Sequence, residues 1–239
     1  MGGESESNFR PHWSPDSQSL TFVSNREGKY DLWEKRADGT GTAEPVLDED
    51  QPIREGFRAD DWLVYVEGSD DFSGLLGGGD IFKKRPEMDS VPIPLVVAEN
   101  GQYSATLSPD GRWLAYVSNQ TGREEVWVRP FEGTGQWLVS ISGGAEPVWA
   151  HSGDELFYRN RVNELVSVKV SAGSSFAWDG EDVLFSMSEY LRGSGYPMYD
   201  VSTDDQEFVM LRNNDEAEAN IELILVDNFF EELRQRVGN

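Results

Sequence analysis

Apolar residues in this chain occur in short, nearly continuous runs, and turns rich in glycine, proline, aspartate and serine separate these runs. In Leu63–Val66 and Leu114–Val117 every position is apolar, so neither segment has a polar face. A strand whose two faces are both covered by neighbouring sheets has this pattern. The pattern therefore predicts an all-β chain whose middle strands lie between packed sheets.

The chain contains an internal repeat built around one kind of turn. Residues 11–25 recur as residues 105–119, and weaker copies occupy 57–66, 148–158 and 199–210. The first apolar residue after each turn, here called the anchor, is separated from the next anchor by 43, 51, 42 and 52 residues. The five anchors are Leu20, Leu63, Leu114, Leu156 and Phe208. Periods of 40 to 50 residues are typical of propeller blades.

A second signature follows each anchor, an acidic residue that leads two apolar residues. Its five copies begin at Asp31, Asp80, Glu125, Glu164 and Glu222. Anchors and followers alternate strictly, and an apolar fourth segment ends each of the first four copies. We therefore expect one domain over residues 1–239, a β-propeller of four-stranded antiparallel blades. Its modules are expected at about 8–48, 49–98, 99–141, 142–186 and 187–227.

The fifth module lacks a fourth strand of its own, which leaves two ways to complete the propeller. In a five-bladed closed ring, the N-terminal segment that ends at Phe9 and Arg10 would pair beside residues 221–226. In an incomplete six-bladed ring, the tail or a second chain would cover the gap, because an uncovered strand edge promotes aggregation. Residues 228–237 carry apolar residues on one stripe and are expected to form a short C-terminal helix.

These repeats resemble the Trp-Ser-Pro-Asp-Gly repeats of TolB-like propellers, also called WD40-like or PD40 repeats. Residues 128–131, 142–144, 155–158 and 229–233 are similar to segments of the C-terminal propeller of bacterial serine/threonine-kinase-like proteins. The resemblance implies a bacterial, extracytoplasmic or periplasmic binding or scaffolding module, a sensor or a protein-interaction domain, without catalytic residues. The kinase motifs themselves are absent from this sequence.

Composition narrows the choice of partners. The net charge of −24 repels phosphate backbones, so nucleic acid is not expected as a partner. There is no apolar stretch long enough to cross a bilayer and no signal-peptide pattern at residues 1–7, so direct membrane insertion is not expected. We expect a monomer or weak dimer that binds a protein or a small molecule.

The sequence offers little for catalysis. Cysteine is absent, and His12 and His151, the two histidines, are expected in exposed turn or edge positions without metal-ligand spacing. We therefore expect no cofactor, no metal site and no catalytic residue. The alternative function is a hydrolase or lyase that uses carboxylates in the central funnel of the propeller.

The expected binding surface is the loop-rich rim opposite the Ser-Pro-Asp-Gly turns. Arginine and tyrosine dominate interaction hot spots, and the topology places several of them on this rim. The candidate binding residues are Arg26, Arg54, Tyr103, Arg123, Glu146, Arg161, Tyr196 and Tyr199.

Overall fold

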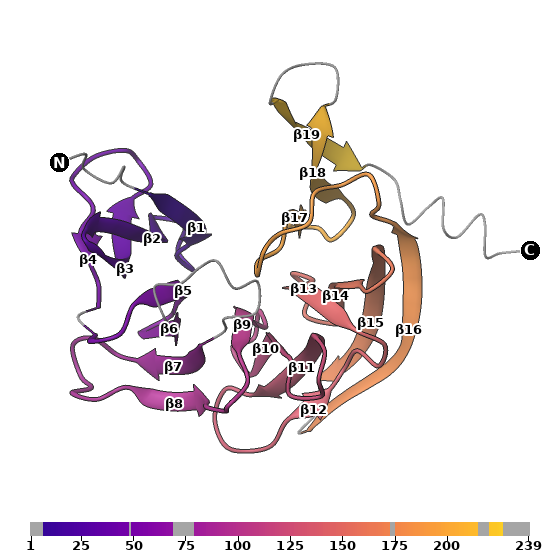
Figure 1. Ribbon diagram of the computed structural model, residues 1–239, viewed down its shortest axis with the longest axis horizontal. Helices are drawn as coiled ribbons and strands as arrows, with labels where there is room; N and C mark the ends of the chain where they lie inside the picture. The colour runs from indigo at the N-terminus through magenta and orange to yellow at the C-terminus, as the bar shows by residue number, and fades with distance from the viewer. Residues whose placement is uncertain (1–6, 48, 69–78, 173–174, 215–219, 227–239) are drawn as a thin grey trace, which may run out of the picture. The chain divides into compact units, whose positions relative to one another are not determined.

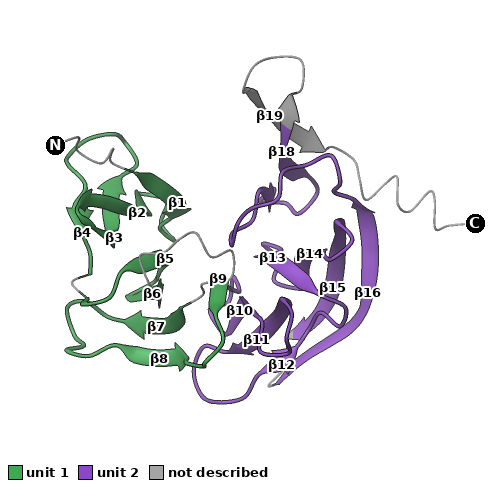
Figure 2. Cartoon of the chain, viewed as in Figure 1, with its two compact units in different colours: residues 1–105 green, residues 106–239 purple. Residues whose placement is uncertain are grey.

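The computed structural model describes residues 7–47, 49–68, 79–172, 175–214 and 220–226, and its strands form five antiparallel sheets (Figure 1). The chain divides into two compact units, residues 1–105 and residues 106–239 (Figure 2). Within the described residues there is no helix. An all-β chain of four-stranded antiparallel sheets, as the repeat predicts, is therefore confirmed.

The first unit holds two complete sheets. Sheet one consists of β1 (Asn8–Trp13), β2 (Ser19–Glu27), β3 (Lys29–Arg36) and β4 (Glu44–Pro45), in that order. Sheet two consists of β5 (Ile53–Ala59), β6 (Trp62–Glu67), β7 (Asp80–Lys84) and β8 (Ile93–Val96). The first strand of sheet two, β5, contacts β1, β2 and β3, so one face of sheet one is covered by sheet two.

The second unit repeats this arrangement. Sheet three consists of β9 (Gln102–Leu107), which contains the boundary between the units, β10 (Trp113–Ser118), β11 (Glu125–Pro130) and β12 (Trp137–Leu138). Sheet four consists of β13 (Gly144–Trp149), β14 (Glu155–Asn160), β15 (Glu164–Ala172) and β16 (Phe176–Ser186). Sheet five has three described strands, β17 (Tyr199–Val201), β18 (Phe208–Asn214) and β19 (Asn220–Val226).

The repeated turn forms for a local reason. A serine at its first position accepts a hydrogen bond through Oγ from the backbone N five residues later, and its own backbone N donates to the carbonyl of that same residue. This geometry occurs at Ser14, Ser108 and Ser202, with Oγ–N distances of 2.9, 2.9 and 3.0 Å. The aspartate two residues later accepts from the serine hydroxyl at 2.6 to 2.7 Å. Each turn closes through a residue with positive φ, respectively Ser17, Gly111 and Asp205.

The anchors and followers meet in the same register in each of the first three sheets. The residue two positions after the anchor pairs with an aromatic residue of the third strand. These pairs are Phe22 with Trp33, Tyr65 with Phe82 and Tyr116 with Trp127. The repeat read from the sequence is thus a repeat of strand pairing.

The two ways of completing the propeller stay predictions. Phe9 and Arg10 belong to β1, where Phe9 pairs with Val23 of β2, so these two residues are part of the first strand of sheet one. The left-handed backbone of Arg10, φ 53°, makes a bulge in β1 between Phe9 and His12. The predicted helix over 228–237 lies outside the described residues.

Candidate functional site: an open face on sheet one

Equivalent residues of the repeat differ in burial between sheet one and the other sheets. The anchors Leu63, Leu114, Leu156 and Phe208 are all 0% exposed, whereas the anchor Leu20 of sheet one is only half-buried. Two residues after the anchor the contrast recurs: Phe22 is half-buried, while the other sheets place fully buried residues there. These residues are Tyr65, Tyr116, Tyr158 and Met210. The same core position is therefore less covered in sheet one than in the sheets that follow.

The alternation of side chains along β2 explains the difference. Thr21 and Val23 point toward sheet two, where the Thr21 hydroxyl lies 3.4 Å from the carbonyl of Gly56. Leu32 of β3 packs on the same side, so closely that a Cβ at Gly56 would lie 2.9 Å from its Cδ2. Leu20 and Phe22 alternate with these residues and point to the opposite face. Within the first unit, β5 is the strand of sheet two that contacts sheet one most extensively, and it lies on the side of Thr21 and Val23.

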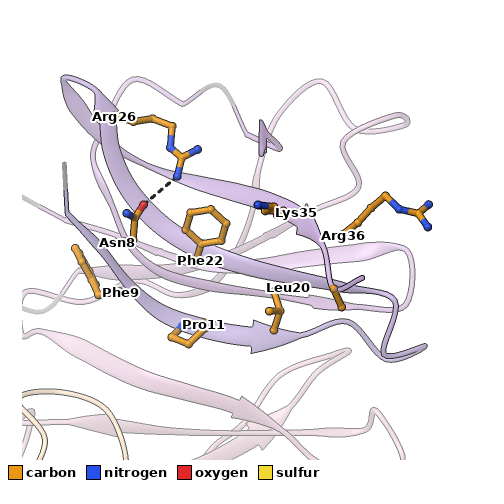
Figure 3. Close-up of a pocket in the computed structure, with 9 residues that line it drawn as sticks. Asn8, Phe9, Pro11, Leu20, Phe22, Arg26, Lys35 and Arg36 are labelled. Carbon is orange, nitrogen blue, oxygen red and sulfur yellow. Dashed lines mark hydrogen bonds between the residues drawn. The ribbon is translucent and has the colours of Figure 1, made fainter. Parts of the chain in front are cut away.

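This opposite face is hollowed into a groove of about 500 Å³ (Figure 3). Its floor is apolar and comes from β1 and β2, and its rim is basic. The lining residues are Asn8, Phe9, Pro11, Leu20, Phe22, Arg26, Lys35, Arg36 and Ala37. Trp13, at the end of β1, is 60% exposed. The groove thus offers aromatic and aliphatic surface to solvent beside three cations.

The three basic side chains of the groove are held differently. The Arg26 guanidinium lies over the rings of Phe22 and Trp33, at 5.2 and 4.6 Å from their centroids, and donates to Oδ1 of Asn8 at 3.0 Å. Arg36 forms an exposed ion pair with Asp38 at 2.6 Å. The Lys35 side chain is exposed and forms no ion pair or hydrogen bond with the residues that the structure describes. Carboxylates are absent from the lining, so the lining residues themselves carry a net positive charge although the chain is strongly acidic.

The eight residues expected on the rim separate into several environments. Arg26 is the member of the set that lines the groove. Glu146 and Tyr199 come together in the second unit, where the Tyr199 hydroxyl donates to the backbone carbonyl of Glu146 at 2.8 Å. Both are buried, at 2% and 5% exposed, so they hold the sheets in place and offer no surface to a partner.

A residue that the sequence did not single out completes the Glu146 cluster. Arg159 is 1% exposed. Its Nε lies 3.5 Å from Oε2 of Glu146, and its Nη2 donates a hydrogen bond to the carbonyl of Leu191 at 2.6 Å. The backbone N atoms of Gly193 and Met198 donate to the Glu146 carboxylate at 3.2 and 3.5 Å. Burial raises the pKa of Glu146, and the charge of Arg159 opposes this shift.

The remaining five candidates do not converge. Arg54 and Tyr103 are buried in the first strands of sheets two and three. Arg123 and Arg161 are exposed at the ends of sheets three and four, and Tyr196 is half-buried in the loop before β17. The Arg123 side chain is occupied, because it pairs with Glu125 at 2.5 Å and donates to the carbonyl of Ile141 at 3.0 Å. A common rim formed by the eight residues stays a prediction.

His12 is less exposed than the sequence predicts for a residue at a strand edge. Its ring lies 5.6 Å from that of Phe57 in sheet two and is half-buried. Burial, together with the charge of Arg10, lowers the pKa of His12 to about 4, so the ring is neutral at pH 7. His151 is exposed in its turn, where Asp205 accepts from the backbone N atoms of His151 and Ser152.

The described residues lack two kinds of feature. They contain no group of three or more His, Asp or Glu side chains arranged to hold a metal ion. Equally, they contain no helix that could cross a membrane.

Solved structures share this fold, although no family model and no curated protein matches the sequence. TolB from Acinetobacter baumannii is 14% identical with a TM-score of 0.69, over 94% of this chain and 52% of that chain. A nidogen/laminin complex structure is 8% identical with a TM-score of 0.64, over 93% of this chain and 76% of that chain. An oligogalacturonate lyase in complex with manganese is 12% identical with a TM-score of 0.63, over 97% of this chain and 64% of that chain.

These similarities show the fold, a TolB-like β-propeller, and this chain spans about half the length of the Acinetobacter TolB chain. They do not decide between binding and catalysis, because the propellers that are similar in structure include an enzyme. The narrower resemblance to the propellers of kinase-like proteins stays a prediction.

Proposed function

We propose that this chain is a non-catalytic binding propeller that holds a segment of another protein in the groove of sheet one. One observation carries the proposal: residues at core positions of the repeat, Leu20 and Phe22, face an open groove in sheet one, while their counterparts in the other four sheets are fully buried. Open apolar surface of this kind, rimmed by polar residues, is typical of a protein-interaction site.

The chemistry of the groove favours binding over catalysis. Its lining contains no histidine, carboxylate or hydroxyl group that could act as an acid, base or nucleophile. Its floor instead provides Phe9, Pro11, Leu20 and Phe22, whose burial by a partner would supply about 25 cal/mol per Å² of apolar surface. The nidogen/laminin structure is a propeller seen in a protein complex, which supports the same class of function.

Selection from a displayed library of random 12-residue peptides tests the proposal with the full chain as bait. We expect the wild type to enrich peptides that the Phe22→Asp variant no longer retains, because a carboxylate in the floor would have to be desolvated by the partner. The control bait is Val97→Asp, which places the same charge at an exposed apolar residue outside the groove. Enrichment that Phe22→Asp and Val97→Asp leave equally intact would show that the groove is not the binding surface.

The alternative function, a hydrolase or lyase in the funnel of the propeller, is tested separately. A panel of ester, peptide, glycoside and uronate substrates is incubated with the full chain, with and without added divalent metal. We expect no turnover above that of the heat-denatured protein. Reproducible turnover abolished by one substitution in an innermost strand would favour the enzyme instead.

A further inference from the structure

We infer that the partner segment held in the groove of sheet one is acidic, with carboxylates next to an aromatic or branched aliphatic residue. This inference rests on the proposed function and adds the chemical class of the partner. The open floor at Leu20 and Phe22 accepts the apolar residue, and the basic rim selects the carboxylates.

The residues that line the groove differ in charge from the chain as a whole. The chain has 20 basic and 44 acidic side chains, yet three of the nine groove-lining residues are basic and none is acidic. On a surface this acidic, a local basic site attracts cationic partners less than its surroundings do and attracts a carboxylate at close range. The local charge of the groove is thus opposite to that of the chain.

Arg26 and Lys35 present their charges at the groove in different ways. Arg26 stacks on two aromatic rings, so its guanidinium is fixed at the edge of the groove next to the floor. Lys35 is exposed, lines the same groove and makes no ion pair with a described residue. A carboxylate that reaches Lys35 therefore does not have to displace an internal partner.

The size of the site and the net charge of the chain distinguish a peptide from an extended anionic surface. A groove of about 500 Å³ accommodates a few side chains. A membrane or a nucleic acid would also bring many negative charges against the rest of a chain of net charge −24. A short acidic segment engages the basic rim without this wider repulsion.

The experiment uses the full chain and three fluorescein-labelled 10-residue peptides with the same two central phenylalanines. Their flanking residues are four glutamates, four glutamines or four lysines, and binding is followed by fluorescence anisotropy. We expect the glutamate peptide to bind at least tenfold more tightly than the glutamine peptide, with an affinity that falls as salt is raised, and the lysine peptide to bind least.

Two charge-reversal variants separate the local effect from the net charge. Lys35→Glu should weaken the glutamate peptide at least fivefold and strengthen the lysine peptide. Lys169→Glu changes the net charge equally at an exposed position of β15 in sheet four and should leave the affinities within twofold. Equal effects of the two variants would overturn the inference, because the preference would then be a property of the whole chain.

The remaining outcomes distinguish the two proposals. Equal, Phe22-dependent binding of the glutamate and glutamine peptides would support the groove but overturn the acidic partner. Binding by none of the peptides in a Phe22-dependent way would count against both proposals. Tighter, Phe22-dependent binding of anionic lipid vesicles than of the glutamate peptide would replace the peptide by a membrane surface. A stable dimer of the wild type that Phe22→Asp dissociates would make a second copy the occupant.

Discussion

The guanidinium of Arg10 donates a hydrogen bond to Oε2 of Glu55 at 2.8 Å, and both side chains are almost completely buried, at 8% and 6% exposed. The pair joins β1 of sheet one to β5 of sheet two. The other carboxylate oxygen of Glu55 accepts from the backbone N of Ala105 in β9 at 2.9 Å. A single acidic residue thus links the first strands of three consecutive sheets.

Removing one member of this pair should destabilise the fold strongly. Arg10→Met leaves the Glu55 carboxylate buried without its counter-charge, which typically costs about 3–5 kcal/mol. The double variant Arg10→Met/Glu55→Gln removes both charges and should be more stable than Arg10→Met alone. Urea unfolding measures Arg10→Met, Glu55→Gln and the double variant. A double variant whose loss equals the sum of the two single losses would contradict the coupling.

An exposed ion pair supplies the control for this comparison. Arg36 and Asp38 lie 2.6 Å apart at 67% and 46% exposure. Arg36→Met should change the free energy of unfolding by less than about 1 kcal/mol, because exposed pairs contribute little.

Stability should depend on pH through His12. Its pKa is lowered from 6.5 to about 4 in the folded chain, so the unfolded chain takes up a proton first as the pH falls. The stability that neutral His12 contributes is present above pH 6.5 and is lost between about 6.5 and 4. His12→Gln should remove up to about 3 kcal/mol of this pH dependence. A difference in unfolding free energy between the variant and the wild type that stays constant from pH 7 to 4 would contradict this.

Glu146 should make stability depend on pH with the opposite sign to His12. Burial raises its folded-state pKa above 4.5, so the unfolded chain loses its proton first as the pH rises. The stability linked to protonated Glu146 is present below about pH 4.5 and is lost as the pH rises through the folded-state pKa. The stability of Glu146→Gln relative to the wild type should therefore increase from pH 4 to 7, whereas that of His12→Gln should decrease. The same trend in both variants would show that one of the two assignments is wrong.

Because one face of sheet one is open, alanine substitutions of two equivalent leucines should lower the free energy of unfolding by different amounts. Leu63→Ala removes a fully buried anchor and should cost about 2–5 kcal/mol. Leu20→Ala removes the equivalent anchor at the groove and should cost at most about 1–2 kcal/mol, because less of the side chain is removed from water. Thermal or urea unfolding of the two variants checks the difference. Equal losses would indicate that other parts of the protein cover this face.

The sequence by itself determined the strands and their pairing, because these depend on local pattern. The serine and aspartate of each turn fold the chain back through hydrogen bonds that span five residues, and the apolar runs that follow become middle strands. Anchors such as Leu63 and Leu114 were identifiable for the same reason. The fold class can therefore be predicted from the sequence.

Only the tertiary structure decided which of these residues are exposed. Leu20 and Leu63 have the same residue type at the same place in the repeat, so no local signal distinguishes the open position from the buried one. Topology alone placed Glu146 and Tyr199 on an accessible rim, yet packing between sheets four and five buries both. Exposure depends on which sheet covers a face, and that is set by contacts between residues far apart in the sequence.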